Sequence, residues 1–167
     1  SSACQVCHRE SENNLLKNVY DRQDKVLELS KIASHSLVKA HIEAKTAWEN
    51  GATEEQMKPV LELIRKAQWR WDFVAASHGA SFHAPLESAR ILGNSIEKSE
   101  QSRVLLAEIL GKLNVSLPIK YPDVSTKEKA QIYIGLDINK LKEDRKVFLE
   151  TVVPVWDKEA NERHDKM

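Results

Sequence analysis

An apolar repeat runs through residues 12–50 and constrains the fold more than any other feature of this chain. Most of its members are three or four residues apart, as on one face of an α-helix: Leu15, Val19, Val26, Leu29, Ala33, Leu37, Ala40, Ala44 and Trp48. Gly51 follows as the expected C-terminal cap. A helix of about 40 residues is about 60 Å long. In a chain of 167 residues, such a helix is expected to pack against a second copy or a larger body.

The rest of the chain also reads as helical. Thr53 and Gln56 have the spacing of a capping box, which predicts a helix from there to about Ser77, with Pro59 bending its first turns. Pro85 is expected to open a third helix that continues to about Leu113. Its predicted inward side chains are Leu86, Ala89, Leu92, Ile96, Leu106, Leu110 and Leu113.

Two shorter helices are expected near the C-terminal end. Residues 114–124, with two prolines, read as an extended connection. A second capping box, 125–128, predicts a short helix to about Ile134, and Asp137 is expected to cap a last helix to about Glu162, kinked at Pro154. The predicted fold class is therefore all-α, a long-helix bundle of about five helices. The expected organisation is a short N-terminal segment, 1–10, which carries both cysteines of the chain, followed by a helical domain, 11–167, with the long helix at about 12–50.

Cys4-Gln5-Val6-Cys7-His8 is the chemically most informative stretch. Two cysteines separated by two other residues and followed directly by histidine form the attachment signature of haem c, so residues 1–10 are predicted to be a haem-attachment segment. The two sulfurs bond the two vinyl groups of one porphyrin, and the imidazole of His8 becomes the proximal ligand of the iron.

Other interpretations of the two cysteines are open at this stage. A CxxC pair also occurs in thioredoxin-like redox sites, in zinc sites and as a simple disulfide. The redox interpretation requires a strand–turn–helix setting, and the chain shows little strand pattern. The zinc interpretation requires further close ligands, and the sequence has only two cysteines.

The composition excludes several classes of function. Lys+Arg and Asp+Glu balance at 25 each, which argues against nucleic-acid binding. No apolar run is long enough for a transmembrane helix. Bacterial haem c is attached outside the cytoplasm, and no signal peptide is present. We therefore expect a processed chain or a fragment of a longer protein.

The window 67–85 holds Trp69, Trp71, His78 and His83. The two tryptophans lie on different faces of a helix, which suits either an aromatic core or a helix beside a large flat cofactor. His78 and His83 are five residues apart and are not expected to ligate one iron together. From the residues alone, His83 is either a structural histidine or a metal ligand at a helix end, and Met57 is either a core residue or a thioether ligand.

Taken together, these segments resemble the C-terminal part of periplasmic pentahaem cytochrome c nitrite reductase, the ammonia-forming enzyme family. The resemblance covers residues 4–157 in order. It is carried by Cys4-Gln5-Val6-Cys7-His8, Ala40-His41, Glu43-Ala44-Lys45, Gly51-Ala52-Thr53, Met57-Lys58-Pro59, Ala67-Gln68-Trp69-Arg70-Trp71-Asp72, Ala76-Ser77-His78-Gly79, His83-Ala84-Pro85, Arg90, Leu92-Gly93, Pro122-Asp123, 125–131 and Ile134-Gly135-Leu136.

The resemblance implies roles for particular residues. Cys4 and Cys7 would hold the fifth haem of the enzyme, an electron relay, with His8 as its proximal ligand. His83 would be the distal ligand of a neighbouring haem iron. The long helix at about 12–50 would form a homodimer interface. The implied partners are the N-terminal multihaem part of the same enzyme and an electron-donor protein, and the implied location is the periplasm.

The chain also departs from the whole family pattern. It lacks the CxxCK motif of the catalytic haem, the further bis-histidine haem motifs, the substrate-side Arg, Tyr and His, and the calcium site. Further haems and calcium are thus expected only in the missing part of the parent enzyme, and no nitrite reduction is expected from this chain alone. Two alternatives stay open: a haem-free helical dimerisation module, and a free-standing monohaem electron carrier with Met57, His78 or His83 as distal ligand.

Overall fold

Helix α1 (Glu12–Glu49) has 38 residues, in a computed structural model that describes residues 6–164 of the chain. The Ser11 side chain caps its start by accepting a hydrogen bond from the backbone N–H of Asn14. Its end is capped at Asn50, and Gly51 follows with φ +89°, in the left-handed region that glycine adopts without a steric penalty. The predicted long helix and its glycine stop are confirmed.

Helix α2 (Glu54–Ala76) begins with the predicted capping box. The Thr53 side chain accepts from the Gln56 backbone, and the Gln56 side chain accepts from the Thr53 N–H at 2.8 Å. The helix continues through Pro59, whose missing N–H removes one intrahelical hydrogen bond. These reciprocal bonds stabilise the helix terminus that the proline would otherwise weaken.

A one-turn helix, α3 (Ala80–His83), precedes the long helix α4 (Pro85–Lys112), which Pro85 opens as predicted. Leu86, predicted to point inward, is 86% exposed, so that prediction was wrong. It lies two residues from buried Ser88, about 200° away around the helix. The buried face of α4 instead carries four serines that the sequence pattern did not mark as core: Ser88, Ser95, Ser99 and Ser102.

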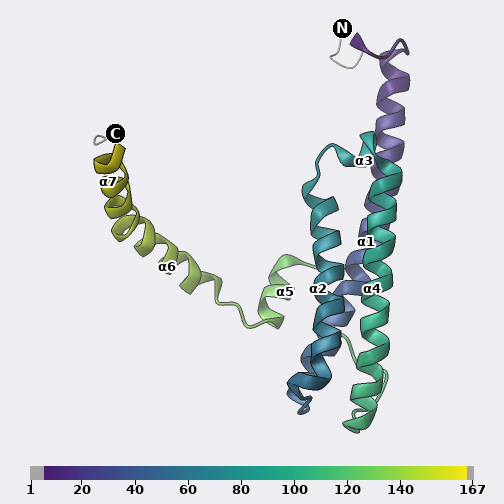
Figure 1. The fold of residues 1–167 in the computed structure, drawn as a ribbon, viewed down its shortest axis with the longest axis vertical. Coiled ribbons are helices and arrows are strands. Elements are labelled where there is room, and N and C mark those ends of the chain that lie inside the picture. The colour runs from purple at the N-terminus through teal and green to yellow at the C-terminus, as the bar shows by residue number, and fades with distance from the viewer. Residues whose placement is uncertain (1–5, 165–167) are drawn as a thin grey trace. The chain divides into compact units, whose positions relative to one another are not determined.

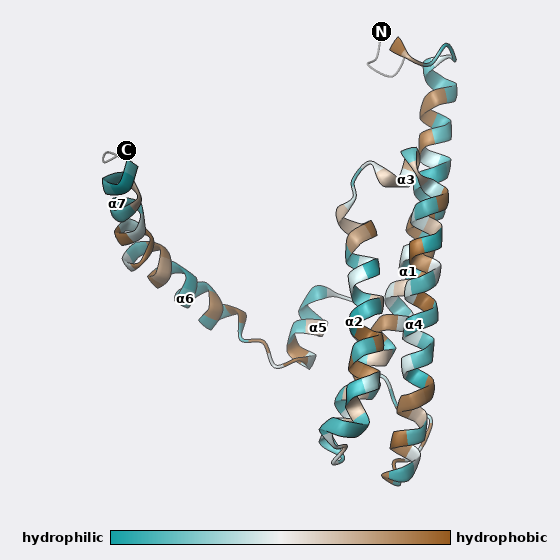
Figure 2. Ribbon diagram, viewed as in Figure 1, coloured by the Kyte–Doolittle hydropathy of each residue, from teal (hydrophilic) through white to brown (hydrophobic). Residues whose placement is uncertain are grey.

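Helices α1, α2 and α4 pack as a three-helix bundle (Figure 1). Helix α4 contacts α1 and α2 more extensively than these two contact each other. Helices α1 and α4 run in the same direction, since Ser36 bonds Glu100 and, further along both helices, Glu43 bonds Arg103. Helix α2 runs opposite to both. Hydrophobic residues recur along each helix of the bundle (Figure 2). The larger core cluster includes Leu37, Met57, Val60, Leu106 and Leu110.

Residues from Lys120 onward form a second compact unit, separate from the one that ends at Ile119. It contains α5 (Lys127–Tyr133), α6 (Ile138–Thr151) and α7 (Val153–His164). The N-cap of α5 is Thr126, one residue later than the predicted box, because its hydroxyl accepts from the Lys129 N–H. Asp137 caps α6 as predicted. The expected last helix is interrupted at Val152, two residues before Pro154.

The described residues form helices without strands, which confirms the all-α class. They give seven helices rather than about five, because α3 was not expected and the last helix is divided. None of these helices combines the length and the apolar composition needed to cross a membrane. The predicted division of the chain into a haem-attachment segment, 1–10, and a helical domain, 11–167, stays a prediction.

Candidate haem-binding site

The segment Val6–Glu10 carries the part of the CxxCH motif that the structure describes. Cys4 lies outside the described residues. Cys7 is a free, exposed cysteine, and His8 beside it is also exposed. Neither side chain has a hydrogen-bond partner among residues 6–164, so the thiol and the imidazole are both accessible. This donor pair fits haem c, which needs an open thiol for a thioether bond and a neutral imidazole for the iron.

His83 ends the one-turn helix α3, directly before Pro85 starts α4. Its backbone N–H bonds the Gly79 carbonyl, and the neighbouring Phe82 carbonyl accepts from Arg22 Nη1 at 3.1 Å. The turn is therefore attached to α1. The imidazole is exposed and lies against the Phe82 ring, with centroids 4.3 Å apart. No described residue hydrogen-bonds its nitrogens, which leaves them free to bind a metal.

His8 and His83 lie at different levels of α1. Arg22 on α1 donates to the Phe82 carbonyl of α3, so α3 lies beside the part of α1 near residue 22. Helix α1 itself begins ten residues earlier, at Glu12. That stretch of helix rises about 15 Å, and His8 precedes it in the chain at the outer end of α1 (Figure 1). The two imidazoles are too far apart to ligate the same iron.

The two tryptophans of α2 lie on different faces, as predicted. Trp71 is half-buried, packs against both core clusters, and donates its indole N–H to the Ser30 carbonyl at 3.1 Å. Trp69 is 66% exposed and stacks on Phe73, with centroids 5.8 Å apart. Trp69 and Phe73 are four residues apart on one helix, a spacing that brings side chains together. The sequence therefore contained a signal for this exposed aromatic pair, but the pair was not predicted from it.

Met57 is fully buried in the core of the bundle. It is therefore a core residue, and the interpretation as a haem ligand was wrong. His35, His41 and His78 are exposed, and His41 Nε2 lies 3.4 Å from Gln68 Oε1. Within residues 6–164, no group of three or more His, Cys, Asp or Glu side chains is arranged to hold a metal ion.

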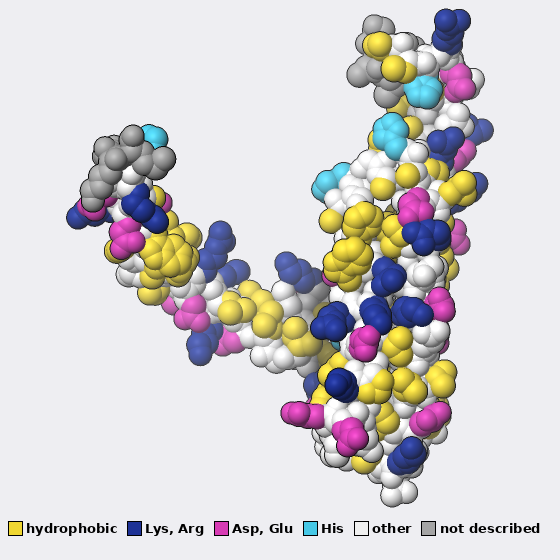
Figure 3. All heavy atoms as spheres, viewed as in Figure 1, with side chains coloured by type: hydrophobic (Ala, Val, Ile, Leu, Met, Phe, Trp, Pro, Cys, Tyr) yellow, Lys and Arg dark blue, Asp and Glu magenta, His cyan; other side chains and the backbone are white. Residues whose placement is uncertain are grey.

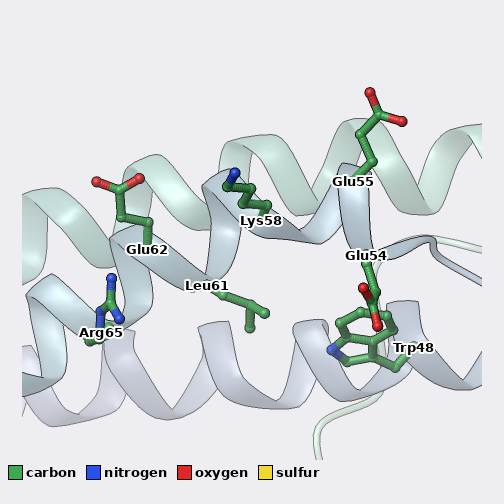
Figure 4. Close-up of a pocket in the computed structure, with 7 residues that line it drawn as sticks. All are labelled: Trp48, Glu54, Glu55, Lys58, Leu61, Glu62 and Arg65. Carbon is green, nitrogen blue, oxygen red and sulfur yellow. The ribbon is translucent and has the colours of Figure 1, made fainter.

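A cavity of about 770 Å³ lies at the other end of the bundle, between α1 and the first turns of α2. Trp48 and Leu61 face one another across it, while Glu55, Lys58 and Glu62 point outward (Figure 4). A hydrogen bond from Lys66 lowers the pKa of Glu62. The cavity is lined by charges of both signs and by no histidine or cysteine, so it offers no ligand for haem iron.

Figure 3 shows histidine side chains gathered at the end of the bundle where α1 begins, over α3 and the N-terminal segment. An exposed Cys-His pair before a long helix, in the CxxCH motif, is typical of one class of protein, the helical haem c proteins.

Comparison with known proteins agrees with this class. The sequence profile of the cytochrome c552 family matches residues 1–165. The chain is 56% identical over 161 residues to the cytochrome c-552 of Parabacteroides distasonis, covering 96% of this chain and 33% of that protein. It is 54% identical to those of Porphyromonas gingivalis and Bacteroides fragilis, covering 94% and 92% of this chain and 32% and 31% of the relatives.

The chain belongs to the cytochrome c552 family, a family of haem c proteins. It spans about a third of the length of the curated relatives it matches.

Proposed function

We propose that this chain is the C-terminal, haem-anchoring part of an ammonia-forming cytochrome c nitrite reductase of the periplasm. Cys4 and Cys7 form the thioether bonds to one haem c, and His8 is the proximal ligand of its iron. The observation that carries the proposal is the open presentation of Cys7 and His8 immediately before α1, in a chain of the cytochrome c552 family.

His83 is proposed as the distal ligand of a different, neighbouring haem iron. Its accessible ring on a turn held to α1 by Arg22 and its separation from His8 along α1 support this role. A haem with two imidazole ligands is six-coordinate and transfers single electrons instead of binding substrate. The task of the protein residues is to hold such imidazoles at fixed positions.

The long helix α1 is proposed to form a homodimer interface. Besides its core face it has a second apolar stripe, at roughly 100° to the first, that no other described element covers. Its members are Leu16, Tyr20, Leu27 and Val38, which are 44%, 58%, 52% and 37% exposed. Residues at this spacing fall on one line of a helix and are suited to pack against the same line of a second copy.

In the parent enzyme, nitrite is reduced to ammonium with six electrons. This part of the chain would hold a relay haem between the electron-donor protein and the N-terminal multihaem part, which carries the catalytic haem, further haems and calcium. The chain itself supplies attachment, axial imidazoles and a dimerisation surface, and no nitrite reduction is expected from it alone.

The free-standing electron-carrier alternative requires a distal ligand from within the chain. Met57 is excluded by its burial, and His83 lies about 15 Å or more along α1 from the start of the helix. The haem-free helical module is favoured by one observation: side chains of α1, α2 and α4, among them Leu37, Met57 and Leu106, pack on one another in the larger core cluster. The following measurement distinguishes it from the proposed function.

The test is haem attachment in the chain exported to a periplasm that assembles haem c. A pyridine haemochrome spectrum with haem quantified against protein should give one covalent haem per chain. Replacing both Cys4 and Cys7 by serine should give none, while His83→Ala should leave the stoichiometry at one. If the wild-type chain from the same cells carries no haem, the haem-anchoring proposal fails and the haem-free helical module is the function that remains.

The dimer proposal has its own test. Leu27→Glu places a charge in the middle of the second stripe and should convert a dimer into a monomer in sedimentation-velocity experiments. The matched control is Val104→Glu, since Val104 is 62% exposed on α4. A monomeric wild-type chain, or equal effects of the two substitutions, would argue against an interface through α1.

A further inference from the structure

An aromatic and basic surface lies on α2 and α4 near His83. Trp69 and Phe73 form its apolar part: their rings stack at 5.8 Å with 25° between the planes, and the side chains are 66% and 48% exposed. Exposing two large aromatic rings side by side forgoes the free energy of burying them. A pair held in this way is a surface that a flat apolar group would cover.

Two arginines border the same ring pair. Arg70 and Arg90 line a cavity of about 250 Å³ together with Trp69, Phe73, Ile91 and Asn94. Arg70 donates from Nη1 to the Lys66 carbonyl and has no carboxylate partner in the part of the chain that the structure describes. Arg90 pairs with Glu87, and both side chains are more than half exposed, so water screens this pair. The cavity thus combines aromatic faces with guanidinium donors for an anion.

This surface and His83 belong to the same end of the bundle. Ser95 Oγ donates to the Ala67 carbonyl, and further along α2 Phe73 shares a cavity with Arg90 on α4. The two helices therefore run in opposite directions, with residues near 70 next to residues near 90. His83 ends α3 two residues before Pro85 opens α4, and Arg90 lies five residues into α4, a rise of about 7.5 Å from Pro85. On the face seen in Figure 3, hydrophobic side chains lie between the histidines and a group of Lys and Arg side chains.

We propose that Trp69, Phe73, Arg70 and Arg90 bind the propionate-bearing edge of the haem whose iron His83 ligates. Haem combines a metal that takes an imidazole, a flat apolar macrocycle and carboxylates on one edge. This end of the bundle offers the three complementary groups: the exposed imidazole of His83, the stacked rings of Trp69 and Phe73, and guanidinium groups, which bind carboxylates with paired, charge-assisted hydrogen bonds. This inference rests on the proposed function of His83 as a haem ligand.

The test is a titration of the whole chain with iron protoporphyrin IX, followed by the Soret band of imidazole-ligated haem and by quenching of tryptophan fluorescence. Arg70→Gln should weaken binding about tenfold, as expected for the loss of a charge-assisted pair. Arg65→Gln is the matched control, because Arg65 lies one turn before Trp69 on the same helix but lines the cavity near Trp48 and not the one with Arg70 and Arg90, and it should leave the affinity within about twofold.

A second porphyrin tests the propionate site separately from the ligand role of His83. The dimethyl ester of iron protoporphyrin IX has no carboxylates and should bind the wild-type chain and Arg70→Gln equally. If the ester and the free acid bind wild type alike, or if Arg65→Gln weakens binding as much as Arg70→Gln, the propionate site is wrong. In a chain whose His8 is replaced by alanine, so that the imidazole of the CxxCH motif cannot bind the added haem, His83→Ala should abolish the imidazole spectrum. If that spectrum persists, the ligand role of His83 fails instead, whatever the arginine variants show.

Discussion

Glu43 is a buried carboxylate, and its environment shows how single residues hold the bundle in register. Its side chain is 9% exposed and accepts from Arg103 Nε at 3.0 and 3.2 Å. Arg103 also bonds Glu100, which accepts from Ser36 at 2.5 Å. The Arg103–Glu43 and Ser36–Glu100 contacts join α1 to α4 at residues about 60 positions apart, and a shift of one helix along the other would break both.

Replacing Arg103 by alanine should lower the free energy of unfolding by about 2 kcal/mol, because Glu43 then loses its guanidinium partner while still buried. Urea unfolding followed by circular dichroism measures it. Lys66→Ala is the control: it removes the exposed pair with Glu62 and should change the free energy of unfolding by less than about 0.5 kcal/mol. Equal losses in the two variants would mean that the buried network does not stabilise the bundle.

Glu100 should make the stability of the bundle depend on acid pH. Burial raises its pKa, but hydrogen bonds from Ser36 and Arg103 outweigh burial, so the pKa is lowered from its ordinary value of 4.5. The folded state therefore gains stability from ionised Glu100 above pH 4.5, and loses it as the pH falls through the lowered value. Glu100→Gln should show a shallower loss of stability in urea unfolding below pH 4.5. An unchanged slope would contradict this.

At the scale of the helices, side-chain caps decide where each element begins. Ser11, Thr53, Thr126 and Asp137 each accept from a backbone N–H in the first turn of the following helix. Gly51 and Gly135, with φ +89° and +71°, follow the ends of α1 and α5. Pro154 divides the last helical stretch, because proline offers no N–H to the carbonyl four residues before it.

Thr53→Ala should destabilise the bundle by about 1 kcal/mol, because the N-terminal N–H groups of α2 lose their cap. The thermal unfolding midpoint of the bundle measures the effect. Thr126→Ala provides a matched control: it removes the same kind of cap from α5, which lies in the second unit. That variant should leave the midpoint of the bundle unchanged, and a similar drop in both variants would show that the two units unfold together.

At the scale of the whole molecule, the chain consists of one unit with a core and one without. The unit that ends at Ile119 holds both core clusters. In the second unit, none of the described residues is buried, although Phe148 and Trp156 contact each other edge to face at 5.4 Å. The stability of the chain is therefore expected to come from the first unit.

A chain ended after Ile119 should unfold at the same temperature as the full chain, within about 2 °C, since a shift of that size corresponds to well under 1 kcal/mol in a domain of this size. Differential scanning calorimetry on the two chains tests this. A clearly lower midpoint for the shorter chain would mean that residues from Lys120 onward contribute to the same cooperative core.

Some parts of the fold could be predicted because their causes are local. The capping residues, the glycine stops and the 3.6-residue repeat act within a few positions, so the bounds of α1, α2 and α4 follow from neighbouring residues. Cys4, Cys7 and His8 were found in the same way, because the haem c motif spans five consecutive residues. The sequence by itself determined the all-α class, the long helix and the haem-attachment motif.

Only the tertiary structure decided which helix faces are buried and what lies beside His83. The serine face of α4 is buried because α1 and α2 pack there, and Leu86 is exposed on the opposite side. Trp71 is held by Ser30, 41 residues away, and the turn of His83 by Arg22, 60 residues from Phe82. Such contacts depend on how whole helices pack, which a pattern read over a few turns of one helix does not contain.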